Sequence, residues 1–314
     1  MSNPHFVIRD KCPVCASDSL RTIYQSPFNE PPIRDYLEEF YSPTGGVEFE
    51  YLEKAIYFLF ECNICGLIFQ KEIPNDNLME RLYEYWIEPH KVFNQQQKKN
   101  GLGLYSYYAQ EIIQIIAYFE EAPSSLCFLD FGMGWGKWAL MAKAFGCDSY
   151  GSELSKERIE YAKSNGVKVV SWMEIPQHQF DFINTEQVFE HIPQPLQTLR
   201  HLKNALKPNG ILKISVPIAN DIERRLKTMD WKAPKGTRDS LNPVAPLEHI
   251  NFFRRKSLLK MASIAGMEEV LISIKRRYQY TTRWRGMKRI AKNVLLPVYH
   301  NILKRRNCSF FRKV

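Results

Sequence analysis

From about residue 100 onward, short apolar runs alternate with segments in which apolar residues recur at helical spacing. A helical pattern comes first, over 102–120, and the apolar runs then lie at 125–131, 148–153, 167–170, 180–184 and 211–217. Alternation of strands and helices predicts an α/β fold with a parallel sheet and right-handed crossovers. Because ligands bind such sheets at the carboxyl ends of the strands, the residues that follow each run are the first candidates for chemistry.

The N-terminal region has a different pattern, dominated by two Cys-x-x-Cys pairs. The four residues are Cys12, Cys15, Cys62 and Cys65. The second pair lies between two strand-like runs, 55–60 and 67–70. Two such turns can direct four thiolates at one point, which predicts a structural Zn²⁺ in a zinc-ribbon-like domain. Four unrelated structural thiols or an iron–sulfur cluster are the alternatives.

The run at 125–131 leads into a glycine-rich loop that precedes a helical pattern. Asp130 lies at the end of the strand, and three glycines spaced two apart follow it: Gly132, Gly134 and Gly136. Glycines let the backbone approach a ligand closely, and a helix N-terminus offers unpaired N–H groups. A dinucleotide fingerprint would need a glycine where Lys137 stands, so the loop argues against NAD. The next strand ends in a carboxylate, Glu153.

This loop resembles motif I of the class I S-adenosylmethionine-dependent methyltransferases, and the similarity covers about residues 100–275. Three further features support it: Glu190-His191-Ile192, Lys207-Pro-x-Gly210 and Glu248-His249-Ile250. The resemblance implies a Rossmann-like sheet in which Glu153 binds the ribose hydroxyls and Asp130 lies near the methionine part of the cofactor. The residues expected to bind S-adenosylmethionine are Asp130, Gly132, Gly134, Gly136, Glu153, Glu186 and Gln187.

Two residues beyond the fourth strand, Glu190 and His191, are the predicted catalytic residues. An imidazole at this place can accept a proton from a substrate hydroxyl, or from carbon, while Glu190 orients the ring. Some relatives use similar pairs as metal ligands, but Gln187 stands where a further carboxylate would help a metal. The alternative is that His191 only caps a helix and packs. His249 is expected to be structural.

The charge of the chain is distributed unevenly. Its 314 residues carry a net charge of +9, which by itself would indicate nucleic-acid binding. Residues 1–75, however, carry five more acidic than basic side chains, and residues 275–314 carry 13 basic and no acidic ones. The basic excess therefore belongs to a tail, and nucleic acid is not an expected partner.

The segment 275–314 is predicted to form a basic amphipathic tail. Its apolar residues at helical spacing are Met287, Ile290, Ala291, Val294, Val298 and Ile302. Such a helix either lies on an anionic membrane or docks its apolar stripe on the body of the protein. No apolar run reaches the length of a membrane span, and the cysteine pattern suits a reducing compartment. We therefore expect a cytoplasmic protein, held at the inner face of the membrane if the tail binds lipid.

The chain is expected to comprise a zinc-binding domain (1–75), a helical connection (76–120), a methyltransferase domain (121–274) and the tail (275–314). The insertion 218–247 within the methyltransferase domain is expected to be a substrate lid, with a packing element or an oligomer contact as the alternatives. A four-cysteine domain ahead of this catalytic pattern resembles bacterial methyltransferases of sugar and polysaccharide biosynthesis. That resemblance implies a small-molecule, sugar-nucleotide or glycan-precursor acceptor. An RNA methyltransferase is the alternative enzyme, and the acidic N-terminal domain argues against it. The alternative from another class is a non-catalytic zinc-ribbon scaffold that binds the cofactor. The sequence leaves the oligomeric state open.

Overall fold

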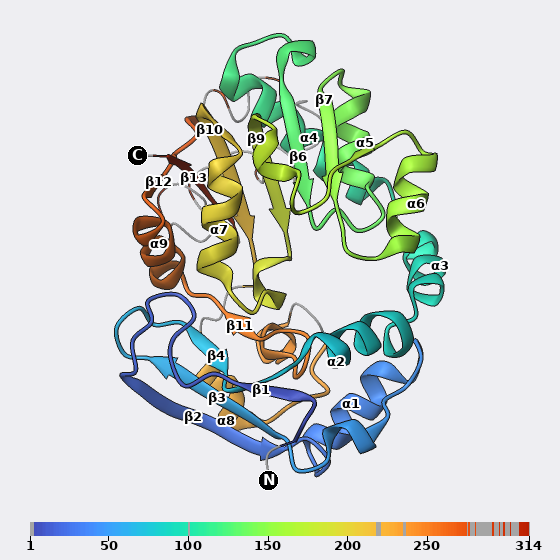
Figure 1. Cartoon of the computed structure of the whole chain (residues 1–314), viewed down its shortest axis with the longest axis vertical. Coiled ribbons are helices and arrows are strands. Elements are labelled where there is room, and N and C mark those ends of the chain that lie inside the picture. The colour runs from blue at the N-terminus through green and yellow to red at the C-terminus, as the bar shows by residue number, and fades with distance from the viewer. Residues whose placement is uncertain are drawn as a thin grey trace. The chain divides into compact units, whose positions relative to one another are not determined.

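The computed structural model of the chain describes residues 3–99, 101–217, 221–234, 237–274, 276, 280, 291, 295, 298, 302 and 308–313. The chain divides into two compact units, neither of which is continuous in sequence (Figure 1). Unit 1 comprises residues 1–99, 189–198 and 217–264, and unit 2 comprises residues 100–188, 199–216 and 265–314. Within the described ranges, no helix is both long and apolar enough to cross a membrane.

Unit 2 is built on a sheet whose seven described strands have the order β12-β13-β10-β9-β6-β7-β8. The strands from β10 to β8 run parallel, whereas β13 pairs antiparallel with both β10 and β12. The predicted α/β fold with a mostly parallel sheet is therefore confirmed. The strands are β6 (Cys127–Phe131), β7 (Asp148–Ser152), β8 (Lys168–Val169), β9 (Phe180–Glu186), β10 (Leu206–Ser215), β12 (Met267–Glu269) and β13 (Cys308–Lys313).

The central strands of the sheet in unit 2 are buried beneath helices. All residues of β9 except the last are buried, as expected for a central parallel strand. Phe128 and Phe182 of the sheet pack with Trp138 of one helix and with Ile112 and Ile115 of another. The helices of this region are α4 (Leu102–Phe119), α5 (Lys137–Ala144), α6 (Lys156–Ser164) and α7 (Pro195–Asn204), the last of which begins in unit 1.

Unit 1 is built on a smaller antiparallel sheet with the order β11-β4-β3-β2, beside a β1–β5 pair. These strands are β1 (Phe6–Ile8), β2 (Leu20–Pro27), β3 (Ile56–Cys62), β4 (Ile68–Gln70), β5 (Glu72–Pro74) and β11 (Asn251–Phe252). Its helices are α1 (Ile33–Tyr41), α2 (Asp76–Arg81), the π-helix η2 (Leu82–Trp86), α3 (Pro89–Lys99), the 3₁₀ turn η5 (Phe189–His191), α8 (Ile222–Thr228) and α9 (Arg255–Ile264). The predicted boundary at residue 75 differs from that of unit 1, because β11 and α8 return to the N-terminal sheet.

The insertion 218–247 contributes buried side chains to the hydrophobic core of unit 1. Ile222, Trp231 and Val244 are buried in that core together with Tyr57. The Tyr57 hydroxyl also donates a hydrogen bond to the Val244 carbonyl, at 2.6 Å. Contacts of this kind are expected of a packing element, and the substrate lid stays a prediction.

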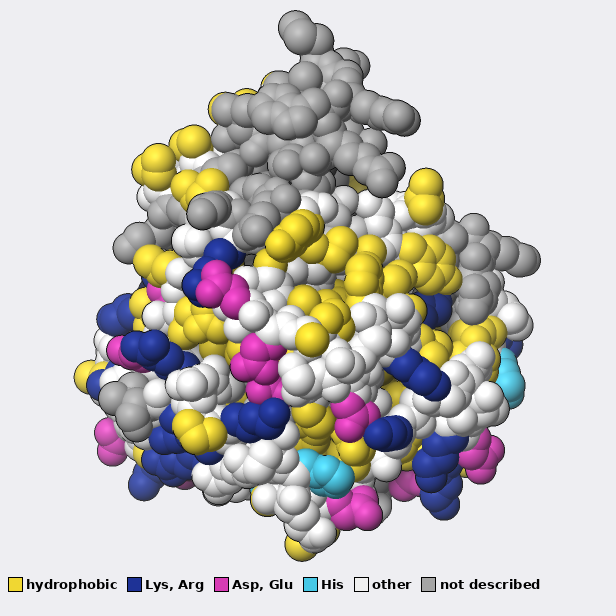
Figure 2. Space-filling view, turned by 90° about the horizontal axis from the view of Figure 1, so that it is seen from above, with side chains coloured by type: hydrophobic (Ala, Val, Ile, Leu, Met, Phe, Trp, Pro, Cys, Tyr) yellow, Lys and Arg dark blue, Asp and Glu magenta, His cyan; other side chains and the backbone are white. Residues whose placement is uncertain are grey.

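The end of the predicted tail, β13, is a strand of the sheet in unit 2. Of the apolar residues in the amphipathic pattern expected before it, Met287, Ile290 and Val294 lie outside the described residues. Figure 2 shows one face of the molecule, on which basic and acidic side chains are scattered among hydrophobic ones. Neither charge covers a continuous area of the described atoms on that face.

Candidate functional site

The glycine loop of unit 2 follows β6 at the carboxyl ends of the parallel strands. Gly132, Gly134 and Gly136 all have positive φ, between 54° and 71°. A Cβ atom at Gly132 would lie 2.6 Å from a methyl group of Val188, whereas one at Gly134 would meet no atom within 4 Å. The loop therefore needs glycine for its backbone conformation, and its Gly134 edge is open for a ligand.

Glu153, at the end of the neighbouring strand β7, is hydrogen-bonded to this loop. Its Oε2 accepts from the Gly134 N–H at 2.9 Å, and its Oε1 accepts from the N–H groups of Leu154 and Ser155 at 2.9 and 3.3 Å. Three backbone donors thus hold the carboxylate beside the open edge of the loop. Carboxylate oxygens have further acceptor capacity, so Glu153 can also accept from ligand hydroxyls.

Asp130, the last polar residue of β6, is buried and lies close to other ionisable groups. Its Oδ1 accepts a hydrogen bond of 2.8 Å from the Asn184 side chain on β9. Burial raises the pKa of Asp130 to about 7, although the bond from Asn184 and the charge of Lys213 oppose the shift. Near neutral pH both the protonated and the ionised form of this carboxyl group are therefore populated.

Glu186, at the end of β9, is paired with a buried lysine that was not among the predicted site residues. Lys213 Nζ lies 2.5 Å from Glu186 and 2.5 Å from Glu111 of α4, and Ser215 donates to Glu186 at 2.9 Å. Lys213 thus pairs with Glu111 and Glu186, and its charge also acts on Asp130. Three carboxyl groups around one lysine give this part of unit 2 an excess of negative charge. Such a site suits a ligand with cationic groups. Gln187 follows with a positive φ of 54°, and its N–H donates to the Ser215 carbonyl.

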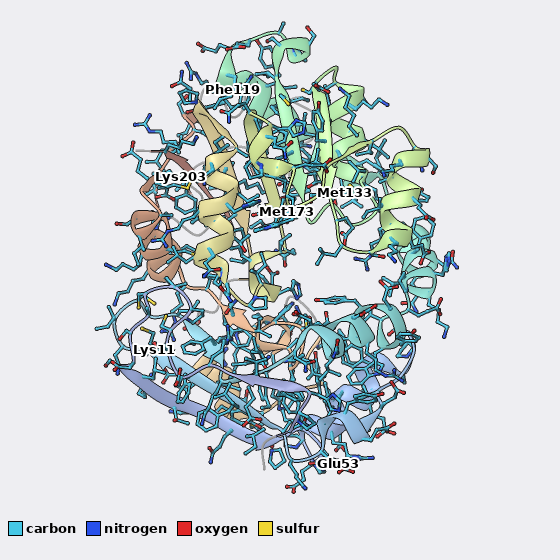
Figure 3. All side chains as sticks on the ribbon, in the orientation of Figure 1. Lys11, Glu53, Phe119, Met133, Met173 and Lys203 are labelled. Atoms are coloured by element: carbon cyan, nitrogen blue, oxygen red, sulfur yellow. The ribbon has the colours of Figure 1, made fainter. Side chains whose placement is uncertain are left out.

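Exposed apolar side chains follow two of the same strand ends. Leu154 after β7 is 94% exposed, and Met173 after β8 is 75% exposed. Figure 3 labels Met173 together with Met133 of the glycine loop. Beside Met173, Trp172 stacks on His201 with 3.7 Å between ring centroids. Large apolar side chains that are exposed at strand ends can pack against a planar ring of a ligand. The sequence did not indicate these residues, because their place beside the loop is known only from the fold.

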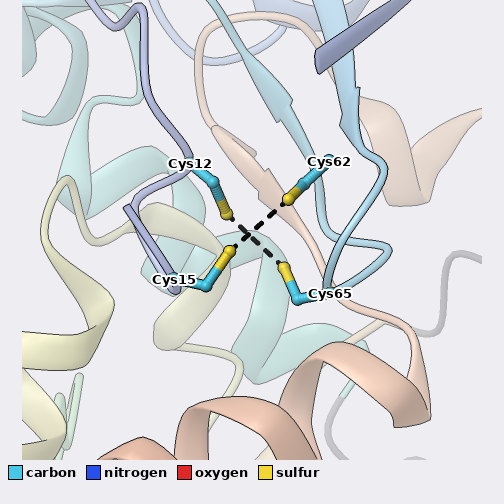
Figure 4. A group of neighbouring side chains, drawn as sticks. All are labelled: Cys12, Cys15, Cys62 and Cys65. Carbon is cyan, nitrogen blue, oxygen red and sulfur yellow. Dashed lines mark hydrogen bonds between the residues drawn. The ribbon is translucent and has the colours of Figure 1, made fainter. Parts of the chain in front are cut away.

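The four predicted metal-ligating cysteines come together in unit 1 (Figure 4). All four Sγ atoms lie within 4.8 Å of one another, with 3.5 Å between Cys12 and Cys65 and between Cys15 and Cys62. A tetrahedral shell with Zn–S bonds near 2.3 Å places its sulfurs about 3.8 Å apart, so the donor set fits zinc. The two pairs also form alike turns, because the N–H of the residue after each pair donates to the first cysteine's carbonyl at 2.9 Å.

The environment of these thiols favours at least one thiolate. The hydrogen bond from Cys65, with those from the backbone N–H groups of Cys15 and Val14, lowers the pKa of Cys12 to about 6. Burial raises the pKa of Cys15 to about 11. A cation at the centre would favour deprotonation of the remaining thiols, since a metal-bound cysteine is a thiolate.

The predicted catalytic pair also lies in unit 1, in the 3₁₀ turn η5. His191 Nδ1 lies 2.8 Å from the Glu248 carbonyl oxygen and 3.1 Å from the Tyr83 hydroxyl. Because a carbonyl oxygen only accepts, the first contact puts the proton on Nδ1 and leaves the lone pair on Nε2. Nε2 lies 4.0 Å from Oε1 of the buried Glu190. The ring of His249 lies 4.9 Å from that of His191, centroid to centroid.

Burial is the main cause of the charge state of His191. It lowers the pKa of the imidazole to about 4, against the smaller opposing effect of the Glu248 carbonyl. The ring is thus neutral at physiological pH, while 24% of its side chain is open to solvent. A neutral imidazole with a free Nε2 is a proton acceptor. Tyr83 was missed because its place beside His191 depends on the π-helix η2, which no sequence pattern indicated.

The catalytic region of the chain matches known proteins. Residues 104–271 match a family model described as a methyltransferase domain. A ubiquinone biosynthesis O-methyltransferase of Aliivibrio fischeri is 26% identical over 161 residues, which cover 45% of this chain and 63% of that protein. The corresponding protein of Cereibacter sphaeroides is 25% identical over 203 residues, covering 57% and 79%. The chain thus spans less than two thirds of the length of the first of these relatives.

Solved structures with the same type of domain are more distant. A SAM-dependent methyltransferase from Thermotoga maritima is 20% identical with a TM-score of 0.39, covering 58% of this chain and 80% of that chain. The plantazolicin methyltransferase BpumL in complex with SAH is 13% identical with a TM-score of 0.44, covering 76% and 94%.

Proposed function

The chain belongs to the family of the methyltransferase domain, whose match spans more than half of its length, and from this premise we propose that it transfers a methyl group from S-adenosylmethionine to a small-molecule acceptor. The observation that carries the proposal is the open glycine loop with Glu153 held beside it. The family match and the names of the O-methyltransferase relatives support the same activity.

The charges of the residues in unit 2 suit S-adenosylmethionine. The cofactor carries a sulfonium and an α-ammonium group, and the excess of carboxylates around Asp130 and Glu186 offsets positive charge of this kind. Glu153 can accept hydrogen bonds from the ribose hydroxyls, and Leu154 with Met173 can cover the adenine ring. When bound, the cofactor supplies an electrophilic methyl group.

We assign the role of general base to His191. The bound cofactor would supply the methyl group to the acceptor oxygen, and the part of this chain is to take up the proton that the acceptor hydroxyl loses. The acceptor proton passes to Nε2 of His191, which then carries the positive charge beside the carboxylate of Glu190. The Glu248 carbonyl holds the ring by its Nδ1 proton throughout. General-base catalysis of this type contributes about 10²- to 10⁴-fold.

Substitution of His191 tests this role, with a neighbouring histidine as the matched control. The His191→Gln variant should lose about 10²- to 10⁴-fold in kcat and bind S-adenosylmethionine as the wild type does in calorimetry. His249→Gln, which alters a buried ring bonded to the Pro243 carbonyl, should retain turnover. At saturating S-adenosylmethionine, the kcat of the wild type should be unchanged at pH 5 and fall only toward pH 4, where Nε2 becomes protonated. Full turnover in His191→Gln would remove this residue from the mechanism.

Two classes of acceptor have support, one from the relatives and one from the N-terminal region. The relatives are named for ubiquinone biosynthesis, which favours a phenolic hydroxyl, whereas the zinc-ribbon-like N-terminal region motivates a sugar-nucleotide or glycan precursor. A radiolabelled methyl-transfer screen over polyphenols, nucleotide sugars and RNA separates these acceptors. RNA is the second enzyme candidate and would need phosphate contacts from a segment that is net acidic over residues 1–75. Cofactor binding without transfer to any acceptor would instead favour the scaffold function.

For the four-cysteine centre we propose a structural Zn²⁺. Four protein ligands close the coordination shell, so the ion would stabilise the fold of unit 1 and leave no position for substrate.

We further propose that the basic tail binds anionic membrane. A variant that neutralises Arg283, Arg285, Lys288 and Arg289 but keeps β13 should lose co-sedimentation with phosphatidylserine vesicles. If the wild type and the variant sediment equally with these vesicles, the result would favour docking of the tail on the body of the protein.

A further inference from the structure

The turn that carries Glu190 and His191 is attached to the sheet that follows the cysteine centre. Strand β4 begins three residues after Cys65 and pairs with β11, in the register Phe69 to Asn251 and Ile68 to Phe252. The residue before β11, Ile250, donates its N–H to the Glu190 carbonyl at 2.8 Å. A two-residue strand from the distal part of the chain thus connects the cysteine sheet to the predicted base.

Asn251 makes the central contacts of this connection. Its side chain is fully buried, and its Nδ2 donates to the carbonyls of Phe189 at 3.1 Å and Ile192 at 2.6 Å. These carbonyls lie on either side of the Glu190–His191 pair. Together with the hydrogen bond from the Ile250 N–H, two adjacent residues donate to three carbonyl groups of the turn. Three hydrogen bonds at different points restrict both the position and the rotation of the turn.

Arg9, three residues before Cys12, determines the orientation of the Asn251 amide. Its Nη1 donates to Asn251 Oδ1 at 2.8 Å, while Nε and Nη2 donate to the Gln70 carbonyl at 3.0 and 2.7 Å. Nη2 also donates to the Ile250 carbonyl at 2.6 Å. Because guanidinium can only donate, Asn251 must turn its oxygen toward Arg9 and its NH₂ group toward the turn.

We infer that Asn251 and Arg9 are positioning residues that hold the Glu190–His191 turn on the cysteine-centred sheet. Under this inference the N-terminal region fixes the geometry of the base as well as its own fold. The inference rests on the proposed function only where it calls His191 the base. The attachment of the turn is a physical property that can be measured without any acceptor.

The test compares two asparagines with the same bonding pattern. Asn3 is also buried in unit 1, and its Nδ2 donates to two carbonyls, those of Tyr51 and Glu53. Asn251→Asp and Asn3→Asp each replace two donated hydrogen bonds by a carboxylate facing carbonyl oxygens, but only the first affects the turn. Hydrogen exchange followed by mass spectrometry is measured on the full-length, metal-loaded protein, together with metal content and melting temperature.

We expect exchange in peptides covering 187–194 to become about tenfold faster in Asn251→Asp, because two hydrogen bonds are lost, and to stay unchanged in Asn3→Asp. Equally faster exchange of these peptides in both variants would mean that the substitutions destabilise unit 1 in general. Unchanged exchange in both would mean that other contacts hold the turn. Each outcome overturns the inference. If Asn251→Asp fails to fold, Arg9→Lys replaces it, with Arg34→Lys as its control, since Arg34 stacks on Phe49 outside the connection.

The two hypotheses fail separately. If exchange changes as expected but His191→Gln retains turnover, the attachment stands and the role of the base falls. If His191→Gln is inactive and exchange in 187–194 is unaffected by Asn251→Asp, the base stands and the positioning inference falls.

Discussion

Lys213 and Glu186 form an ion pair, with 2.5 Å between the ammonium nitrogen and the carboxylate oxygen, and the Glu186 side chain is 29% exposed. The lysine side chain is fully buried on β10 and also contacts Glu111 of α4. Trp138 of α5 in turn donates to Glu111 at 2.8 Å. The pair therefore connects two helices with the strand end that is expected to face the cofactor, and it couples the stability of unit 2 to the orientation of Glu186.

Removal of this lysine should be strongly destabilising. Lys213→Met leaves two carboxylates without their shared cation. Because the side chain of Glu111 is only 12% exposed, loss of that nearly buried pair should cost about 3–5 kcal/mol in the free energy of unfolding. The control is Lys207→Met on the same strand, because Lys207 pairs with Asp181 at 2.7 Å but is 36% exposed. That change should cost less than about 1 kcal/mol. Urea unfolding of both variants measures the difference. An equal decrease in the free energy of unfolding would show that Lys213 contributes no more to stability than an exposed ion pair does.

The raised pKa of Asp130 predicts a pH-dependent affinity for the cofactor. The carboxyl group titrates near pH 7, and only its ionised form attracts the cationic groups of S-adenosylmethionine. The affinity should therefore rise as the pH increases from 6 to 8, and binding below pH 7 should release a proton. Calorimetry in buffers of different ionisation enthalpy measures both effects.

Asp130→Asn should weaken binding and remove the pH dependence between 6 and 8. Asp148→Asn provides the control, since Asp148 pairs with Lys168 on the exposed side of β7 and β8 and should leave the profile unchanged. A pH dependence that survives in Asp130→Asn would assign the proton to another group.

Loss of the metal should unfold unit 1 beyond the N-terminal residues. Metal binding contributes on the order of 10 kcal/mol to the folding of a four-cysteine module. Because β11 belongs to the same sheet, chelation or Cys62→Ser should expose peptides around 250–253 as well as residues 12–70 to hydrogen exchange. Cys127→Ser, a half-buried thiol on β6, should retain the metal and the protection. Elemental analysis of the native protein should find one zinc per chain, and its absence would reject the assignment.

The sequence predicted those parts of the molecule whose signals are local. The parallel strands β6 to β10 of unit 2 and the glycine loop were recognised because each pattern lies within about ten residues. The cysteine pairs were recognised because their spacing carries the chemistry. Contacts between distant segments gave no such signal. Tyr83 meets His191 across 108 positions of sequence, and Asn251 meets Phe189 across 62. Lys213 was the exception, since a lysine inside an apolar run could have been noticed as a buried charge.

The short strands were missed for a different reason. A two-residue strand such as β11 shows no periodicity, and its place in the sheet is set by hydrogen bonds to a strand about 180 residues earlier. The strand β13 lies at the end of a basic segment, so its charge obscured the buried Phe310 and Phe311. In both cases pairing with another part of the chain overrides the local preference.

The C-terminal strand should be essential for the stability of unit 2. Phe311 is fully buried on β13, which pairs with β10 on one side and β12 on the other. Phe311→Ala should lower the free energy of unfolding by about 3–5 kcal/mol, because a buried aromatic ring is lost and a cavity remains. Arg312→Ala, at an exposed site paired with Glu268, should change it by less than about 1 kcal/mol. If both variants unfold at the same urea concentration as the wild type, β13 does not contribute to the folded sheet, and the C-terminal segment acts as a tail throughout its length.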